Sequence, residues 1–114
     1  MRLKEIAKQL DASVVSAPDG LANEVSGGYV GDLLSVVMAR AKQGNLWVTV
    51  HAHPNIVAVA TLVGLSGIIV AEGTVVDPAT IKRASEEGVT ILTSAHSSFN
   101  VVASLVRMGL EGPF

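Results

Sequence analysis

Hydrophobic residues recur along this chain with two different spacings, and the two alternate. Apolar positions three or four residues apart predict an amphipathic helix at the amino terminus, on Leu3, Ile6, Ala7 and Leu10. Short aliphatic and β-branched runs predict strands at 13–17, 21–25, 46–50, 67–71 and 89–92. Further helical patterns begin near residues 31, 54, 78 and 98. This alternation predicts a layered α/β/α fold with a largely parallel sheet, and a mixed sheet is the alternative.

Residues that start or stop helices support these boundaries. Asp77 and Pro78 form an N-cap and first-turn pair, and Pro54 suits the first turn of the preceding helix. Residues 53–71 carry no formal charge, which approaches the length of a membrane span. Proline and glycine interrupt this stretch, so we interpret it as a buried helix, a loop and a strand. No linker or internal repeat divides the chain, and we expect one α/β domain over residues 1–114.

The composition narrows the classes of partner. Hydrophobic residues make up 49% of the chain and charged residues only 16%, against about 25% in typical soluble domains. Because small domains expose most of their area, this balance favours self-association as a homodimer. Eight basic and ten acidic residues are scattered along the chain and give a net charge of −2. The sequence therefore lacks the clustered positive charge of a nucleic-acid binder. The chain has no cysteine and no apolar signal segment at its amino terminus, which favours a cytoplasmic protein.

Polar and glycine-rich residues gather in four segments, each expected between a strand and the following helix: 26–32, 51–55, 72–77 and 93–98. In a parallel sheet such segments meet at the carboxyl edge, where open α/β sheets bind ligands and helix N-termini attract anions. All three histidines of the chain lie in these segments. The alternative is that these residues only cap helices and turn the chain.

The first segment contains two adjacent glycines, Gly27 and Gly28, which can cradle a phosphate or permit a turn with positive φ. It lacks the lysine of a P-loop and the spacing of a dinucleotide fingerprint. Asp32 lies close behind the glycines and would repel a phosphate. Tyr29 is interpreted as an aromatic ring outside the core that covers a base or another ring.

The histidines allow several kinds of chemistry. His51 and His53 can form a metal pair, but no third ligand has diagnostic spacing, and hydrogen bonding of His53 within its loop or to a ligand is favoured. His96 lies among serines, where helix capping or anion binding is favoured over catalysis because no nucleophile elbow accompanies it. We therefore predict no catalytic residue, metal or cofactor. The predicted ligand site is Ser26, Gly27, Gly28, Tyr29, His53, Asn55 and Ser97.

Four stretches of the chain resemble the DRTGG domain family: "EVSGGYVGDLLS", "LWVTVHAHPNIVAVA", "GIIVAEG" and "ILTSAHSSFNVVASL". The resemblance covers nearly the whole chain from about residue 13, as in a stand-alone member. The five-residue signature of the family falls on residues 24–28, where only the glycine pair is kept. Ser26 stands where threonine is expected, and the arginine of the signature is replaced by Val25. This replacement weakens any charge-based anion role of the segment.

The resemblance implies a fold similar to the amino-terminal domain of HPr kinase/phosphorylase. Such domains occur beside CBS domains in regulated pyrophosphatases, where they are regulatory rather than catalytic. The implied function is a dimeric, non-enzymatic regulatory domain that senses a nucleotide or small phosphorylated ligand. Stand-alone members are similar to proteins encoded near iron-only hydrogenase components. The alternative is therefore a protein-interaction module that docks onto an enzyme complex.

Overall fold

The computed structural model describes residues 1–114 as five strands, five α-helices and one 3-10 helix. The strands are β1 (Ser13–Ser16), β2 (Gly27–Val30), β3 (Asn45–Thr49), β4 (Gly67–Val70) and β5 (Ile91–Thr93). The helices are α1 (Leu3–Gln9), η1 (Pro18–Ala22), α2 (Leu34–Arg40), α3 (Asn55–Val63), α4 (Pro78–Glu87) and α5 (Ser98–Arg107). The strands form one sheet in the order β1-β5-β4-β3-β2, in which only β1 is antiparallel to its neighbour.

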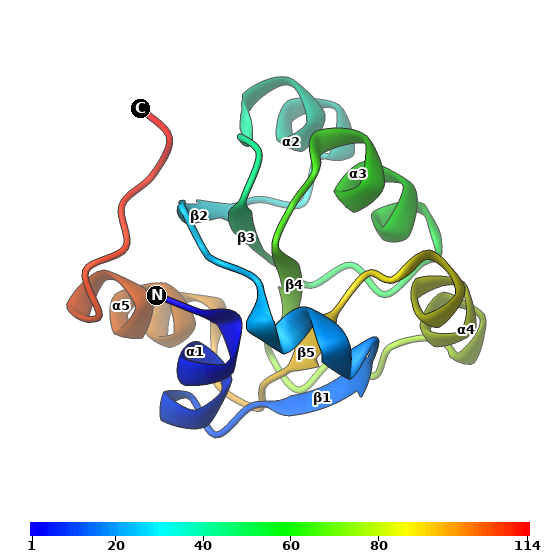
Figure 1. Ribbon diagram of the computed structural model, residues 1–114, viewed down its shortest axis with the longest axis horizontal. Coiled ribbons are helices and arrows are strands. Elements are labelled where there is room, and N and C mark those ends of the chain that lie inside the picture. The colour runs from blue at the N-terminus through cyan, green and yellow to red at the C-terminus, as the bar shows by residue number, and fades with distance from the viewer.

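Helices cover both faces of this sheet (Figure 1). Helices α1 and α5 pack on one face, while α2, α3 and α4 pack on the other. Side chains alternate along each strand, so β3 sends Leu46 and Val48 into the first layer and Trp47 into the second. The predicted α/β/α architecture is confirmed, with the sheet mixed because of β1.

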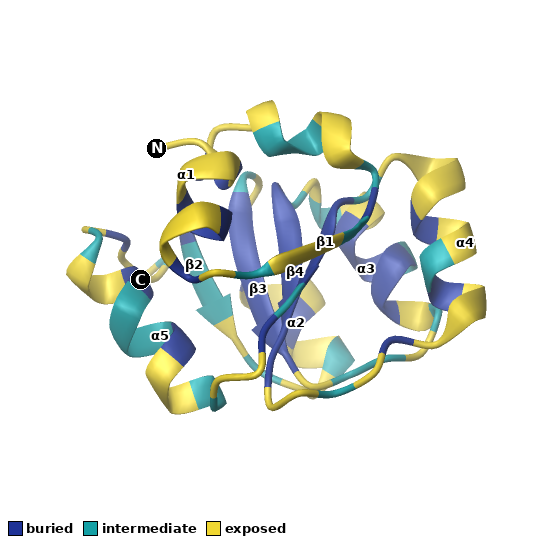
Figure 2. Ribbon diagram, turned by 90° about the horizontal axis from the view of Figure 1, so that it is seen from below, coloured by how far each residue is buried: buried dark blue, intermediate teal, exposed yellow.

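The central strands are buried on both faces, as Figure 2 shows. Their near-continuous apolar sequences are typical of strands covered by helices on both sides. Trp47 is fully buried, and its indole Nε1 donates a hydrogen bond to the Gly31 carbonyl at 2.8 Å. The uncharged stretch 53–71 forms α3, a turn and β4, as predicted. None of the helices combines the length and apolar character needed to cross a membrane.

The predicted boundaries of α3, α4 and α5 agree with the structure, whereas α2 begins at Leu34, three residues later than predicted. Asp77 and Ser97 occupy the N-cap positions of α4 and α5. Gly64 and Gly88 end α3 and α4 in the left-handed conformation, with φ of 79° and 71°. Glycine adopts this conformation without a steric penalty, which explains why both helices stop there.

The prediction of a strand at 21–25 is wrong. Residues 18–22 form η1, and the segment that follows pairs with the amino terminus instead of the sheet. The Leu3 amide donates to the Asn23 carbonyl at 3.0 Å, and the Val25 amide donates to the Met1 carbonyl at 2.9 Å. The second strand therefore begins at Gly27, inside the segment expected to be a loop.

Candidate functional site

The loops at the carboxyl edge of the parallel strands are joined to one another by hydrogen bonds. After β2, one oxygen of the Asp32 carboxylate accepts from the Thr49 hydroxyl at 2.7 Å and from the Val50 amide at 3.1 Å. The imidazole Nε2 of His51 contacts the Asp32 carbonyl. These contacts tie the loop after β2 to the loop after β3.

The remaining loops continue this connection across the edge. The Ala52 carbonyl, after β3, accepts from the Thr80 hydroxyl at 2.6 Å and from the Asp77 amide at 3.3 Å. The Glu72 amide, after β4, donates to the His96 carbonyl at 2.8 Å. All four loops therefore belong to one hydrogen-bonded surface. Because these bonds already restrict the loops, binding of a ligand would cost less conformational entropy.

The first turns of α3 and α5 are already capped. The His53 Nδ1 accepts from the Asn55 amide at 3.0 Å, and the Ser97 hydroxyl accepts from the Asn100 amide at 3.1 Å. The Glu72 carboxylate accepts from the Ser98 amide at 2.7 Å. An internal carboxylate thus occupies the position at the start of α5 where the helix dipole favours an anion.

Glu72 also has an uncommon backbone conformation. Its φ is 65°, in the left-handed region that residues with a Cβ rarely adopt. The loop after β5 holds this conformation, because the amides of Glu72 and Gly73 donate to the His96 and Ser94 carbonyls at 2.8 Å and 3.0 Å. Strained conformations of this kind are enriched at functional sites.

Solvent reaches several polar side chains at this edge. His53, Asn55 and His96 are exposed, and Ser97 and His51 are half-buried. The two histidines of the 51–55 segment have different partners, the Asp32 carbonyl for His51 and the Asn55 amide for His53. No group of three histidine or acidic side chains is close enough to hold a metal ion. The edge offers hydrogen-bond donors and acceptors to a polar ligand.

The structure separates the seven predicted ligand residues into two groups. His53, Asn55 and Ser97 lie at the carboxyl edge, while Ser26, Gly27 and Gly28 lie at the amino end of β2 and Tyr29 lies within that strand. The Ser26 hydroxyl donates to the Gln43 carbonyl at 3.0 Å. The expectation that residues 26–28 belong to a loop at the carboxyl edge is therefore wrong.

Gly27 and Gly28 lie beside the carboxyl-terminal segment of the chain, and Gly27 makes room for it. The Gly28 amide donates to the Glu111 carbonyl at 2.9 Å, so this segment covers part of the edge of β2. A Cβ on Gly27 would lie 2.6 Å from the same carbonyl oxygen. Neither glycine has a positive φ, so a turn does not explain them either.

Near the glycines, the amino terminus carries a small charge cluster. The Met1 ammonium hydrogen-bonds the Glu24 carboxylate at 3.1 Å, with the Arg2 guanidinium 3.5 Å from its other oxygen. The ammonium first, and the guanidinium second, hold the pKa of Glu24 below its usual range. The Glu24 carboxylate is exposed at the surface, so these ion pairs fasten the amino terminus and the cluster offers no catalytic group.

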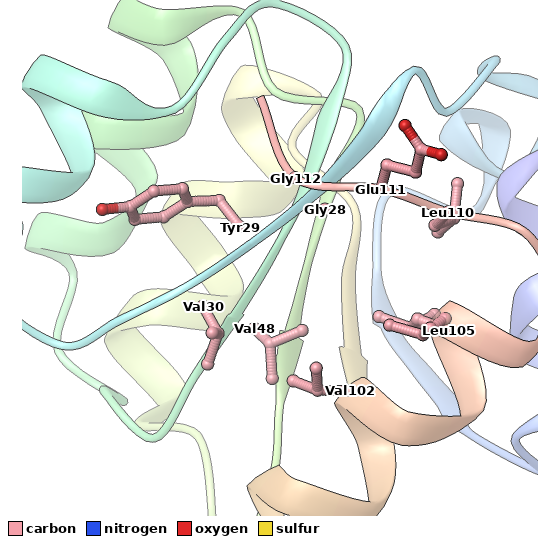
Figure 3. Close-up of a pocket in the computed structure, with 10 residues that line it drawn as sticks. Gly28, Tyr29, Val30, Val48, Val102, Leu105, Leu110, Glu111 and Gly112 are labelled. Atoms are coloured by element: carbon pink, nitrogen blue, oxygen red, sulfur yellow. The ribbon is translucent and has the colours of Figure 1, made fainter. Parts of the chain in front are cut away.

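Tyr29 is not outside the core as expected, because its half-buried ring packs against the layer of α2 and α3. The opposite side of β2 faces a hollow of about 170 Å³, drawn in Figure 3. Its walls are mainly apolar and come from β2, β3, α5 and the segment after α5: Val30, Val48, Val102, Leu105 and Leu110. This hollow was not predicted, although apolar residues on two sides of the last helix were a signal for it.

Comparison with known proteins identifies the family. The model of the DRTGG domain matches residues 5–108. The chain belongs to the DRTGG domain family. The predicted resemblance is therefore confirmed. No curated protein matches the chain.

A solved structure also resembles this DRTGG domain. It contains the CBS and DRTGG domains of the regulatory region of Clostridium perfringens pyrophosphatase, complexed with the activator diadenosine tetraphosphate. The TM-score is 0.75 at 19% sequence identity, over 96% of this chain and 47% of that chain. This chain thus spans about half the length of its structural neighbour, and the similarity establishes the shared fold.

Proposed function

We propose that this DRTGG domain is a non-catalytic regulatory module that binds a nucleotide or another small phosphorylated ligand. The binding surface is the carboxyl edge of the sheet. The observation that carries this proposal is the hydrogen-bonded connection of four loops that leaves His53, Asn55 and His96 exposed. The regulatory region of Clostridium perfringens pyrophosphatase, which contains a DRTGG domain and is complexed with diadenosine tetraphosphate, supports this class of ligand.

The proposed site keeps three of the predicted residues and adds two. His53, Asn55 and Ser97 remain, and His96 and Glu72 join them because they lie on the same hydrogen-bonded loops. Imidazole and amide groups donate hydrogen bonds to phosphate oxygens. Ser26, Gly27, Gly28 and Tyr29 have structural roles away from this edge and are left out of the site.

Glu72 gives the site a means of responding to its ligand. A phosphate at the start of α5 competes with the Glu72 carboxylate for the Ser98 amide. Displacement of the Glu72 carboxylate removes the side-chain contact that joins the loop after β4 to the start of α5, and so loosens the loop between β4 and α4. Binding is thereby converted into a change of loop conformation that a neighbouring domain or protein can detect.

A thermal-shift panel of nucleotides and phosphorylated metabolites tests the ligand proposal. A ligand present at 100 times its Kd stabilises the fold by about 2.7 kcal/mol, or on the order of 10 °C in Tm for a domain of this size. We expect at least one nucleotide to give such a shift and His53→Ala to reduce it. Lys82→Ala, on the outer side of α4, is the matched control and should preserve the shift. A panel without any stabilising compound at millimolar concentration would contradict the proposal.

The second candidate is a protein-interaction module that docks onto an enzyme complex. Val75 favours it, because this apolar side chain is 83% exposed in the loop beside the proposed site. This candidate predicts a stable protein partner and no response to small molecules. For either candidate we propose a cytoplasmic homodimer, as the apolar composition suggests.

A further inference from the structure

Helix α5 is apolar on more than one side. Val101 and Leu105 are buried against the sheet. A second stripe, formed by Phe99, Ala103 and Val106, faces outward, with Phe99 81% and Val106 61% exposed. Helices of soluble proteins with apolar residues on several sides are normally buried on those sides. The outer stripe of α5 therefore needs a partner.

The outer stripe continues onto the sheet edge. Val30 of β2 is 50% exposed and, with Val102 and Val106, lines an open hollow of about 620 Å³. Phe99 stands at this hollow, and Figure 3 shows Val30 and Val102 facing the same space. One surface thus has both a projecting aromatic side chain and a recess beside it.

We propose that a second copy of this chain docks on this surface, with two α5 helices antiparallel about a two-fold axis. We call the surface the α5 face and define it as Val30, Phe99, Val102, Ala103 and Val106. This inference rests on the proposed self-association and deepens it, and its test requires no ligand. A surface that has a projection and a recess side by side can complement itself, as a two-fold interface requires.

Charge complementarity favours the same arrangement. Arg107 lies at the end of α5 and Glu72 caps its start, and neither forms an ion pair within the chain. Antiparallel pairing of the two helices brings each Arg107 to the start of the partner helix, where Glu72 and Phe99 of that copy lie. The guanidinium can then pair with a carboxylate and stack on an aromatic ring.

The sizes also fit. A standard interface buries about 800 Å² on each partner, which is about one seventh of the 5844 Å² exposed by this chain.

Ala103 lies midway along the outer stripe, between Phe99 and Val106. A small side chain at this point lets the two helices approach closely where they cross.

Sedimentation equilibrium over a range of micromolar concentrations tests the α5 face. We expect the unmodified chain to be a dimer and Phe99→Glu to raise the dimer Kd at least about 30-fold, as expected for a buried aromatic hot spot. Leu62→Glu is the matched control because Leu62 is 77% exposed on α3, across the sheet. It should leave the Kd unchanged, with circular dichroism confirming that both variants fold.

Cross-linking tests the two-fold axis. The chain has no cysteine, so a short bismaleimide should join two copies of Ala103→Cys and should not join copies of Leu62→Cys. A chain that is monomeric at high micromolar concentration would overturn the proposal. A dimer that withstands Phe99→Glu, or one in which Ala103→Cys does not cross-link, would overturn it as well. A dimer that binds none of the nucleotides would refute the ligand proposal but not the proposed dimer surface.

Discussion

At the scale of single residues, the glycine pair has the clearest physical explanation. Gly27 and Gly28 were expected either to cradle a phosphate or to permit a turn, and in the structure they do neither. They are extended residues at the start of an edge strand, and the backbone of Glu111 lies against them. Sequence alone does not show this role, because the contacting residue lies more than 80 positions away in the chain.

The two glycines should respond differently to alanine. In Gly27→Ala the new Cβ lies 2.6 Å from the Glu111 carbonyl oxygen, so the segment after α5 must move. We expect a loss of about 1–3 kcal/mol in the free energy of unfolding. In Gly28→Ala the nearest atom is the Leu46 carbonyl oxygen at 3.8 Å, an ordinary contact. Urea denaturation should show little change for Gly28→Ala, and equal losses in the two variants would contradict this explanation.

At the scale of elements, local patterns predicted most of the fold. Strands β3 and β4 are near-continuous apolar runs, and α3 and α4 end at glycines, so local chemistry determines their position. The start of β2 could not be predicted in this way. Residues 21–25 were expected to form a strand, but hydrogen bonds from Leu3 and to Met1, far away in the sequence, hold Asn23 and Val25 at the amino terminus.

The candidate site was only partly predictable for the same reason. The sequence placed His53, Asn55 and Ser97 at the carboxyl edge because each lies between a strand and a helix. It gave no indication that the carboxylate of Glu72 caps α5, since this contact spans 26 positions and depends on a positive φ. Side-chain contacts between loops depend on which strands lie side by side in the folded sheet. The spacing of residues along the sequence does not reveal them.

The Glu72 cap leads to a prediction about the loop after β4. Glu72→Gln keeps a hydrogen-bond acceptor for the Ser98 amide but removes the charge that the helix dipole favours. We expect a loss of about 0.3–1 kcal/mol in the free energy of unfolding, together with tighter binding of diadenosine tetraphosphate. Calorimetric titration of both proteins measures the second effect. Weaker binding by Glu72→Gln would mean that the carboxylate assists the ligand instead of competing with it.

At the scale of the whole molecule, the two proposed surfaces are built from different elements but meet at Glu72. The ligand edge consists of loops after the parallel strands, whereas the α5 face runs along one helix and the adjoining strand β2. Glu72 links them, because it caps the start of α5 and also belongs to the loop after β4. A ligand that displaces Glu72 would therefore change the charge at the dimer surface. Ligand binding could in this way alter the dimerisation of the domain.

The most direct test of the ligand edge is an NMR titration of the labelled domain with diadenosine tetraphosphate and with ATP. Amide shifts report the binding position residue by residue. Our account predicts that the largest shifts fall on residues 51–55, 72–77 and 94–98. Shifts confined to the hollow between β2 and α5, or no shifts at millimolar nucleotide, would contradict it.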